Sequence, residues 1–160
     1  MELEIEVKMT SGALFDYMLY HTYTGMQGIV GTIAGLLLCV LFFMGQSIIY
    51  LVAGLVVVSY LPITLFMKSK QQFLMNPSFK EPLNFKFNDE GMSVSQNDAT
   101  EMLEWGAMYK AVSTPGSIVL YTSKYNASIF PKKELGDNKQ LLIQMISTHM
   151  PAKKVKIRGN

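Results

Sequence analysis

The sequence predicts an α+β membrane protein, in which a two-helix transmembrane hairpin carries a cytosolic, strand-rich domain closed by a C-terminal amphipathic helix. Three observations lead to this prediction. A long stretch without charged residues has room for two membrane spans, short alternating segments separated by turns follow it, and a segment with helical periodicity comes last. With 160 residues, the chain is long enough for one modest domain with attachments.

Residues 1–24 are predicted to form a strand followed by a juxtamembrane helix. Apolar residues alternate with polar ones at Leu3, Ile5, Val7 and Met9. A period of two with one polar face is typical of a half-buried strand. A lone strand needs a sheet, so we expect it to join the strands that follow the hairpin. The helix is expected to begin near Ser11, which is a suitable N-cap.

The apolar stretch is predicted to form two spans. No Asp, Glu, Lys or Arg occurs between Asp16 and Lys68. A helical span needs roughly 20 apolar residues, so residues 25–67 are predicted to be a hairpin with spans at 26–44 and 48–67. A signal peptide is disfavoured, because a basic n-region is missing and a second span follows at once.

The orientation follows from the basic residues near the ends of the spans. Lysines follow the second span at positions 68, 70, 80 and 86, and the connecting turn has none. Because cytoplasmic loops carry the excess of Lys and Arg, the rule predicts a protein of the cytoplasmic membrane with both termini in the cytosol.

Three glycines, Gly28, Gly31 and Gly35, mark one face of the first span. Small residues let helices approach closely in lipid. The face could therefore pack on the second span near Gly54, or it could meet a second copy of the chain or another membrane protein. The spans contain no acid, base or histidine, which argues against a transporter formed by the hairpin alone.

The remaining chain divides into a linker at 68–82, a domain at 83–150 and a basic tail at 151–160. Short strands separated by turns predict a small sandwich or barrel. Residues 138–150 show helical spacing, with Asp137 as a candidate N-cap and Pro151 as a stop. The expected structural core includes Phe85, Phe87, Trp105 and Pro131.

An ordered series of segments carries a family resemblance. The runs "NFKFNDEGMSV", "LEWGAMYKAV", "IVLYTS" and "ASIFPKKEL" follow one another from residue 84 to residue 135. In this order and spacing they resemble the YcxB-like family of small bacterial membrane proteins. The resemblance implies a cytosolic domain similar to a bacterial pleckstrin-homology-like fold. It implies no established reaction, catalytic residue or cofactor.

The residue types argue against catalysis. His21 and His149 have no histidine or cysteine neighbour at metal-ligand spacing, and the single cysteine, Cys39, lies in the first span. Glu101 and Glu104 are better explained as a solvated strand face than as an acid–base pair. We therefore expect no enzyme, no metal and no cofactor.

Basic residues are the candidate contact sites. Lys132 and Lys133 follow Pro131, and the tail adds Lys153, Lys154, Lys156 and Arg158. Near an anionic leaflet each can contribute about 1 kcal/mol. The alternatives are structural punctuation at Pro131 and a solvated, disordered tail. Nucleic acid is a poor partner, because the net charge is only +2 and no stacking platform is evident.

Three functions remain open at this stage. The first is a membrane-anchored, non-enzymatic interaction module that binds a protein partner or anionic lipid. The second is self-immunity against a bacteriocin or secreted toxin, by analogy of size and layout. The third is an accessory subunit of a membrane transporter complex, for which the glycine face is the motivation.

Overall fold

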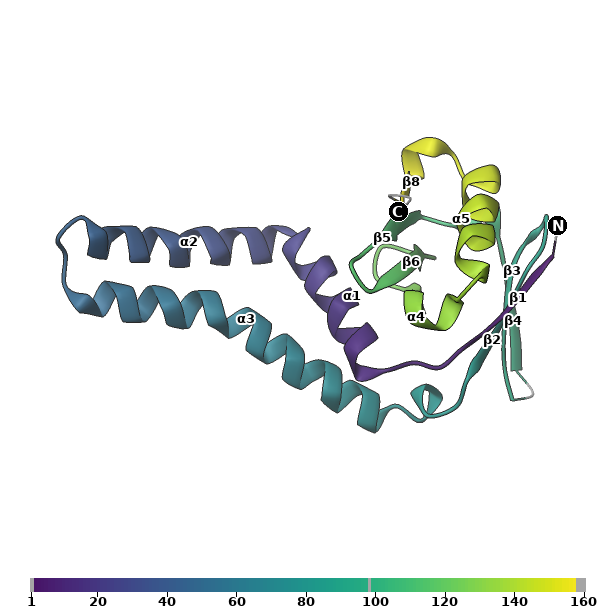
Figure 1. Ribbon diagram of the computed structural model, residues 1–160, viewed down its shortest axis with the longest axis horizontal. Coiled ribbons are helices and arrows are strands. Elements are labelled where there is room, and N and C mark those ends of the chain that lie inside the picture. The colour runs from purple at the N-terminus through teal and green to yellow at the C-terminus, as the bar shows by residue number, and fades with distance from the viewer. Residues whose placement is uncertain (1, 98, 158–160) are drawn as a thin grey trace.

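The computed structural model describes residues 2–97 and 99–157. A helical hairpin projects from a rounded part that contains all the strands (Figure 1). We call this rounded part, residues 2–9 and 77–157, the head. One helix, α1 (Ser11–Tyr23), lies between the head and the hairpin and packs against both. Its N-cap is Thr10, whose side chain accepts a hydrogen bond from the amide of Ala13, rather than the predicted Ser11.

The hairpin consists of α2 (Met26–Phe43) and α3 (Ile48–Met75), which run antiparallel and pack along their length (Figure 1). Gly45 adopts a φ of +88° in the connecting turn, a conformation that glycine adopts without strain. The chain bends sharply between α1 and α2 (Figure 1). Of the described helices, α3 alone is long and apolar enough to cross a membrane, and α2 qualifies when it is counted together with α1 as one bent span.

The second helix of the hairpin, α3, is longer than the sequence predicted. α3 continues past residue 67 to Met75, so the first half of the segment predicted as a linker, 68–82, is helical. Within this extension the side chain of Ser69 is fully buried, and Phe73 packs in the same hydrophobic cluster as Leu14 and Tyr17 of α1. Pro62 lies inside the helix and does not end it. A short 3-10 turn at Pro77–Phe79 then leads into the head.

The first sheet is antiparallel and has the strand order β1-β2-β3-β4. Its strands are β1 (Leu3–Val7), β2 (Leu83–Phe87), β3 (Gly91–Gln96) and β4 (Ala99–Glu104). Leu3 pairs with Phe87 and Val7 with Leu83, which confirms that the N-terminal strand joins strands from beyond the hairpin. The alternation in β1 places Leu3, Ile5 and Val7 in the core.

The second sheet has the order β7-β6-β5-β8. It contains β5 (Lys110–Ser113), β6 (Ser117–Tyr121), β7 (Ala127–Pro131) and the short β8 (Val155–Lys156). β8 pairs with β5 in parallel, with Lys156 opposite Val112. The described part of the segment predicted as a basic tail therefore includes an edge strand, preceded by a 3-10 turn at Ala152–Lys154.

Two helices complete the head. The short α4 (Lys132–Leu135) follows β7 directly, and α5 (Asn138–His149) matches the predicted amphipathic helix to within one residue. α5 buries Leu142, Met145 and Ile146 in the main core, which also contains Phe85, Phe87, Phe130 and Trp105. The protein is thus an α+β structure with two sheets, and α5 packs its apolar face against their shared core.

Candidate functional site

A polar groove of about 650 Å³ opens in the head beside α1. We call it the lysine groove, because three of its lining side chains are lysines. The lining residues are Tyr20, Ser113, Thr114, Pro115, Lys132, Lys139 and Lys156. Among these described residues there is no carboxylate. The lysines come from α4, α5 and β8, so three segments that are separate in the sequence contribute lysines to the lining of one groove.

The turn between β5 and β6 forms one wall of the groove. The amide of Thr114 donates to the carbonyl of Ser117 over 2.9 Å, and the amide of Ser117 donates to Oγ1 of Thr114 over 2.9 Å. These two bonds close the turn tightly. Ser113 and Pro115 are thereby fixed on either side of Thr114, at the rim of the groove.

Lys132 is bound to this turn. Its amide donates to the carbonyl of Gly116 over 2.9 Å, and its Nζ donates to the carbonyl oxygens of Thr114 and Pro115. The preceding Pro131 is buried and ends β7. Lys132 therefore has a structural role, and its charge is held at the groove by the same bonds. An ammonium group has three donors, so two carbonyl partners leave one donor for a ligand.

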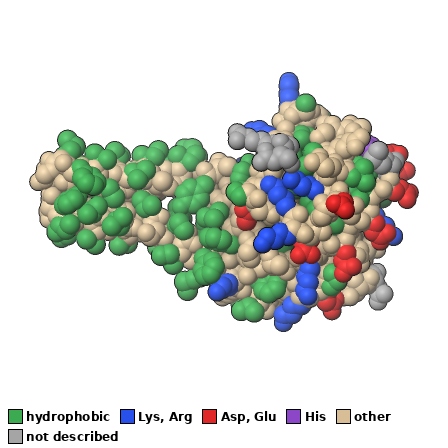
Figure 2. Space-filling model, in the orientation of Figure 1, with side chains coloured by type: hydrophobic (Ala, Val, Ile, Leu, Met, Phe, Trp, Pro, Cys, Tyr) green, Lys and Arg blue, Asp and Glu red, His purple; other side chains and the backbone are tan. Residues whose placement is uncertain are grey.

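The position of Lys156 depends on strand pairing. Because β8 pairs in parallel with β5, Lys156 lies opposite Val112 and close to Ser113 in the groove wall. Lys139 reaches the groove from the first turn of α5. On the face shown in Figure 2, Lys and Arg side chains lie on the head with Asp and Glu side chains among them, and the projecting hairpin shows neither kind.

Asp16 links the groove wall to α1. Its carboxylate accepts a hydrogen bond from the hydroxyl of Thr114 and a second one, of 3.3 Å, from the amide of Gly116. Tyr20, one helical turn further along α1, lines the groove itself. The helix that leads into the hairpin is therefore attached directly to the turn that forms the groove.

Aromatic packing strengthens this attachment. The rings of Tyr17 and His21 in α1 lie 6.0 Å and 6.2 Å from the ring of Tyr121 in β6. Tyr121 is fully buried, and its hydroxyl has no hydrogen-bond partner among the described residues. Burial raises the pKa of the Tyr121 phenol above its ordinary value, and the neighbouring Tyr17 and Tyr20 raise it further.

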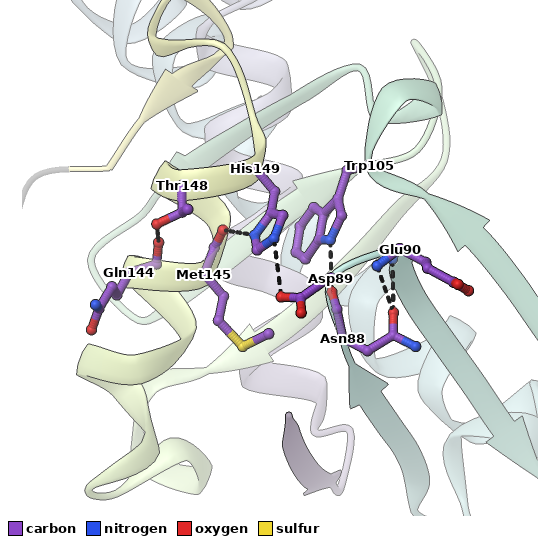
Figure 3. Close-up of polar contacts among 9 residues, drawn as sticks. Asn88, Asp89, Glu90, Trp105, Gln144, Met145, Thr148 and His149 are labelled. Carbon is purple, nitrogen blue, oxygen red and sulfur yellow. Dashed lines mark hydrogen bonds and ion pairs between the residues drawn. The ribbon is translucent and has the colours of Figure 1, made fainter. Parts of the chain in front are cut away.

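A second polar cluster lies at the opposite end of α5 (Figure 3). The ring of His149 stacks on Trp105, with centroids 5.1 Å apart and 13° between the planes. Its Nδ1 lies 3.0 Å from the carbonyl oxygen of Met145, and its Nε2 lies 3.4 Å from Oδ1 of Asp89. Both partners can only accept, so the protonated ring can donate to both.

Trp105 belongs to the same cluster and to the core. Its side chain is 5% exposed, and Nε1 donates to the carbonyl of Asn88 over 2.9 Å (Figure 3). The cluster thus fastens the end of α5 to the turn between β2 and β3. Each of its members has a structural partner, and we assign it a role in stability rather than in binding.

The other basic residues singled out in the sequence lie outside the groove. Lys133 and Lys153 are exposed. Lys154 donates from Nζ to the carbonyl of Met108 over 2.8 Å, which attaches the segment after α5 to the head. Arg158 lies outside the described residues. The pair in "PKK" is therefore divided, since Lys132 reaches the groove and Lys133 does not.

The three glycines of α2 are not equivalent. Gly35 is buried against α3, where an added Cβ would lie 3.1 Å from the carbonyl oxygen of Gly54. Gly31 also faces α3, with 3.6 Å between an added Cβ and Leu61. Gly28 lies instead at the bend, where an added Cβ would collide with the backbone of Thr22. Gly31 and Gly35 therefore serve the packing of the hairpin.

Sequence reasoning missed Lys139, Tyr20, Ser113 and Asp16 as members of the site or its support. A usable signal existed for Asp16, which is the last charged residue before the apolar stretch. The lysine at position 139 gave no local signal, because it lies on a helix whose neighbours in space are set by the tertiary fold. Among the described residues, no group of three His, Cys, Asp or Glu side chains is placed to hold a metal ion.

Comparison with protein-family models finds a match over residues 87–146, to the family described as YcxB-like protein. The matched segment begins at the end of β2 and ends within α5, so it includes Lys132 and Lys139 of the groove. It excludes the hairpin, β1 and β8. Comparisons with curated proteins and with solved structures found no match.

Proposed function

Since the chain carries a YcxB-like domain at residues 87–146, we propose that it is a membrane-anchored, non-enzymatic interaction module. In this proposal α2 and α3 cross the cytoplasmic membrane, and the head lies at its cytosolic surface. The head then presents the lysine groove to ligands or partners at that surface. The observation that supports the proposal best is the exposed apolar surface of the hairpin.

Large apolar side chains are exposed along both helices of the hairpin. Leu37, Val56 and Ile63 are 59%, 62% and 57% exposed, and apolar side chains cover both helices of the hairpin (Figure 2). The largest apolar patch on a typical soluble protein is about 300–600 Å². A bilayer would cover the hairpin without any further protein contact.

Charge supports the orientation of the proposal. Lys68 and Lys70 are the first charged residues after the apolar stretch, and they lie in the part of α3 that approaches the head. The Nζ of Lys70 lies 4.5 Å from the centre of the Phe66 ring. A lysine at the end of a span can extend towards the headgroups in this way, and an excess of lysines favours the cytosolic side.

The anchor and its orientation can be tested in bacterial membranes. In a Cys39→Ser background, a single cysteine is introduced either at Gln46, in the hairpin turn, or at Lys133, on the head. We expect the full chain to resist extraction by alkaline carbonate. We also expect a membrane-impermeant maleimide to label the Gln46→Cys variant in intact cells and the Lys133→Cys variant only after lysis. Extraction by carbonate, or labelling of Lys133→Cys in intact cells, would contradict the proposal.

The binding role is tested separately, by crosslinking in native membranes. Amine-reactive crosslinkers applied to the full chain should join the exposed Lys133 and Lys153 on the head to neighbouring molecules, which mass spectrometry then identifies. A head that yields only crosslinks within the chain would argue against an interaction module that has a stable protein partner.

A further inference from the structure

We propose that two copies of the chain associate side by side in the membrane through one face of α3, with hydrogen bonds between the copies from the hydroxyl groups of Ser59 and Tyr60. This inference rests on the proposed function, because it requires the hairpin to span the membrane. The face is marked by an apolar groove of about 370 Å³, which we call the α3 groove. Its lining residues are Leu55, Val56, Ser59, Tyr60, Ile63 and Thr64.

The α3 groove lies on the side of α3 that is turned away from α2. Gly54 and Val58 lie against Gly35 of α2. Because successive residues of an α-helix are about 100° apart around its axis, Tyr60 and Ile63 lie on the opposite side of α3. The packing that holds the hairpin together therefore leaves this face available to a further neighbour.

Ser59 and Tyr60 differ chemically from the rest of the exposed surface of the hairpin. Among the described side chains at 28–43 and 48–67, they are the only exposed ones that are polar. The neighbouring Thr64 uses its hydroxyl within the helix, where it donates to the carbonyl of Tyr60 over 2.7 Å. The hydroxyl groups of Ser59 and Tyr60 have no hydrogen-bond partner among the described residues, and Tyr60 is 63% exposed.

These two residues lie near the middle of the span. Position 57 is half-way between Gln46 in the hairpin turn and Lys68, the first charged residue after the apolar stretch. Ser59 and Tyr60 follow position 57 by about 3–5 Å along the helix axis. A long side chain on a helix points back towards the N-terminus of the helix, which for Tyr60 is towards the centre of the bilayer. In a hydrocarbon core about 30 Å thick, neither water nor a headgroup is within reach.

A hydroxyl group at this depth favours a protein neighbour over lipid. Without a partner it costs free energy, because hydrocarbon can neither donate nor accept a hydrogen bond. Contact with a second helix removes this cost where that helix has a polar group at the same depth. A hydroxyl both donates and accepts, so another hydroxyl is a sufficient partner.

A second copy of the chain meets this requirement without any further polar group. All copies have the same orientation in the membrane, so a symmetric pair is related by a twofold axis along the bilayer normal, and the same face of each α3 meets its equivalent. Ser59 and Tyr60 of one copy then lie at the same depth as those of the other. The phenol of each copy can donate to a hydroxyl oxygen of the other, which makes the face complementary to itself.

The first test identifies the neighbour in native membranes. The photoreactive amino acid p-benzoylphenylalanine is placed at Ile63 in the α3 groove or at Leu37 on α2, two positions that are 57% and 59% exposed. We expect irradiation to give a product with twice the mass of the chain from the Ile63 position and little of it from the Leu37 position. A product with another protein at Ile63, or with lipid alone, would overturn the inference.

The second test measures the strength of the association. Full chains with Cys39→Ser and Lys133→Cys carry a donor or an acceptor dye on the head and are reconstituted in phosphatidylcholine vesicles. Energy transfer at a series of protein-to-lipid ratios gives the dissociation constant of the dimer. The test variant is Ser59→Ala with Tyr60→Phe, which removes the two hydroxyl groups and retains apolar side chains. Tyr50→Phe is the matched control, because it removes the same group close to the hairpin turn.

We expect the dissociation constant of the dimer to rise about 5- to 30-fold in the double variant, the range for one interhelical hydrogen bond in a membrane. The control should change it by less than about twofold, because a phenol near the headgroups is already solvated. Tyr60→Phe alone serves where the double variant fails to fold, and it should weaken the dimer about fivefold.

Two results of the second test would overturn the inference. One is energy transfer in the wild type that does not exceed the level of random proximity. The other is an equal effect of the double variant and the control. A chain that resists carbonate extraction but remains monomeric would overturn this inference and leave the proposed anchor intact, whereas extraction by carbonate would remove the anchor itself.

Discussion

The carboxylate of Asp16 in α1 accepts a hydrogen bond from the hydroxyl of Thr114, which lies 98 residues later in the turn between β5 and β6. This contact joins the helix that leads into the hairpin to the wall of the lysine groove. The same carboxylate accepts from the amide of Gly116. A displacement of α1 would therefore move the turn that positions Lys132, so the groove and the hairpin are mechanically coupled.

Replacing Asp16 by Asn should destabilise the head. The substitution keeps the size of the side chain but removes one of two acceptor oxygens and the negative charge. Hydrogen bonds to charged groups contribute about 1.5–3 kcal/mol, so we expect the free energy of unfolding to fall by about 1–2 kcal/mol. Thermal unfolding of the full chain in detergent, followed by the fluorescence of the single Trp105, measures this. Asp137→Asn is the control, because its side chain makes no capping bond to α5. If both variants had the same melting temperature, this would argue against the coupling of α1 to the turn between β5 and β6.

Replacing Gly54 by Ala should weaken the hairpin. A Cβ at this position would lie 2.7 Å from the carbonyl oxygen of Gly35 and 2.5 Å from the sulfur of Cys39, so the two helices must separate. Overpacking of this kind costs about 1–3 kcal/mol. The helicity of the variant should therefore be lost at a lower concentration of sodium dodecyl sulfate.

Gly31→Ala is the matched control for this experiment. The added Cβ would meet Leu61 at 3.6 Å, which is an ordinary contact. Alanine also favours a helix over glycine by about 0.5–1 kcal/mol, so this variant should be as stable as the wild type or slightly more so. Loss of helicity in both variants at the same detergent concentration would show that the close approach of Gly35 and Gly54 is not the cause.

Replacing His149 by Ala should loosen the end of α5. The change removes the stack on Trp105 and both polar contacts of the ring (Figure 3). Aromatic stacking contributes about 0.5–1.5 kcal/mol, so a loss of about 1–2 kcal/mol is expected once the polar contacts are included. Urea unfolding monitored by Trp105 fluorescence measures this loss in the free energy of unfolding. Thr148→Ala, one residue earlier on the exposed side of the helix, should have little effect, and a similar loss there would contradict the assignment.

Replacing Tyr121 by Phe should stabilise the protein, most clearly in alkali. The buried hydroxyl has no hydrogen-bond partner among the described residues, and its removal relieves a desolvation cost of about 1–3 kcal/mol. Burial raises the pKa of this phenol in the folded state, so above about pH 10 the unfolded chain loses the proton first and stability falls as pH rises. The phenylalanine side chain does not ionise, so the variant lacks this loss of stability, and its alkaline unfolding midpoint should move to higher pH. Tyr125→Phe, at an exposed position, should leave the midpoint unchanged.

Much of the fold follows from local patterns. The alternation in Leu3–Val7 predicts a strand, and the spacing in residues 138–149 predicts a helix. Both predictions are possible because a period of 2 or of 3.6 residues can be recognised from neighbouring residues alone. The extent of α3 was missed, since Lys68 and Lys70 suggest a polar linker. The helix instead continues through the buried Ser69 and through Phe73, which packs in one hydrophobic cluster with residues of α1. The tail was misjudged for a similar reason, because the pairing of β8 with β5 is a long-range contact.

The sequence by itself determined that this chain has an apolar hairpin, a strand-rich head and a surplus of lysines after the hairpin. These features depend on composition and short-range periodicity, which are properties of each segment alone and do not require contacts with the rest of the chain. Only the tertiary structure decided which lysines act together. Lys132, Lys139 and Lys156 meet because α4 follows β7, α5 folds back on the core and β8 pairs with β5. Convergence of this kind depends on contacts between distant segments, and neighbouring residues in the sequence do not specify it.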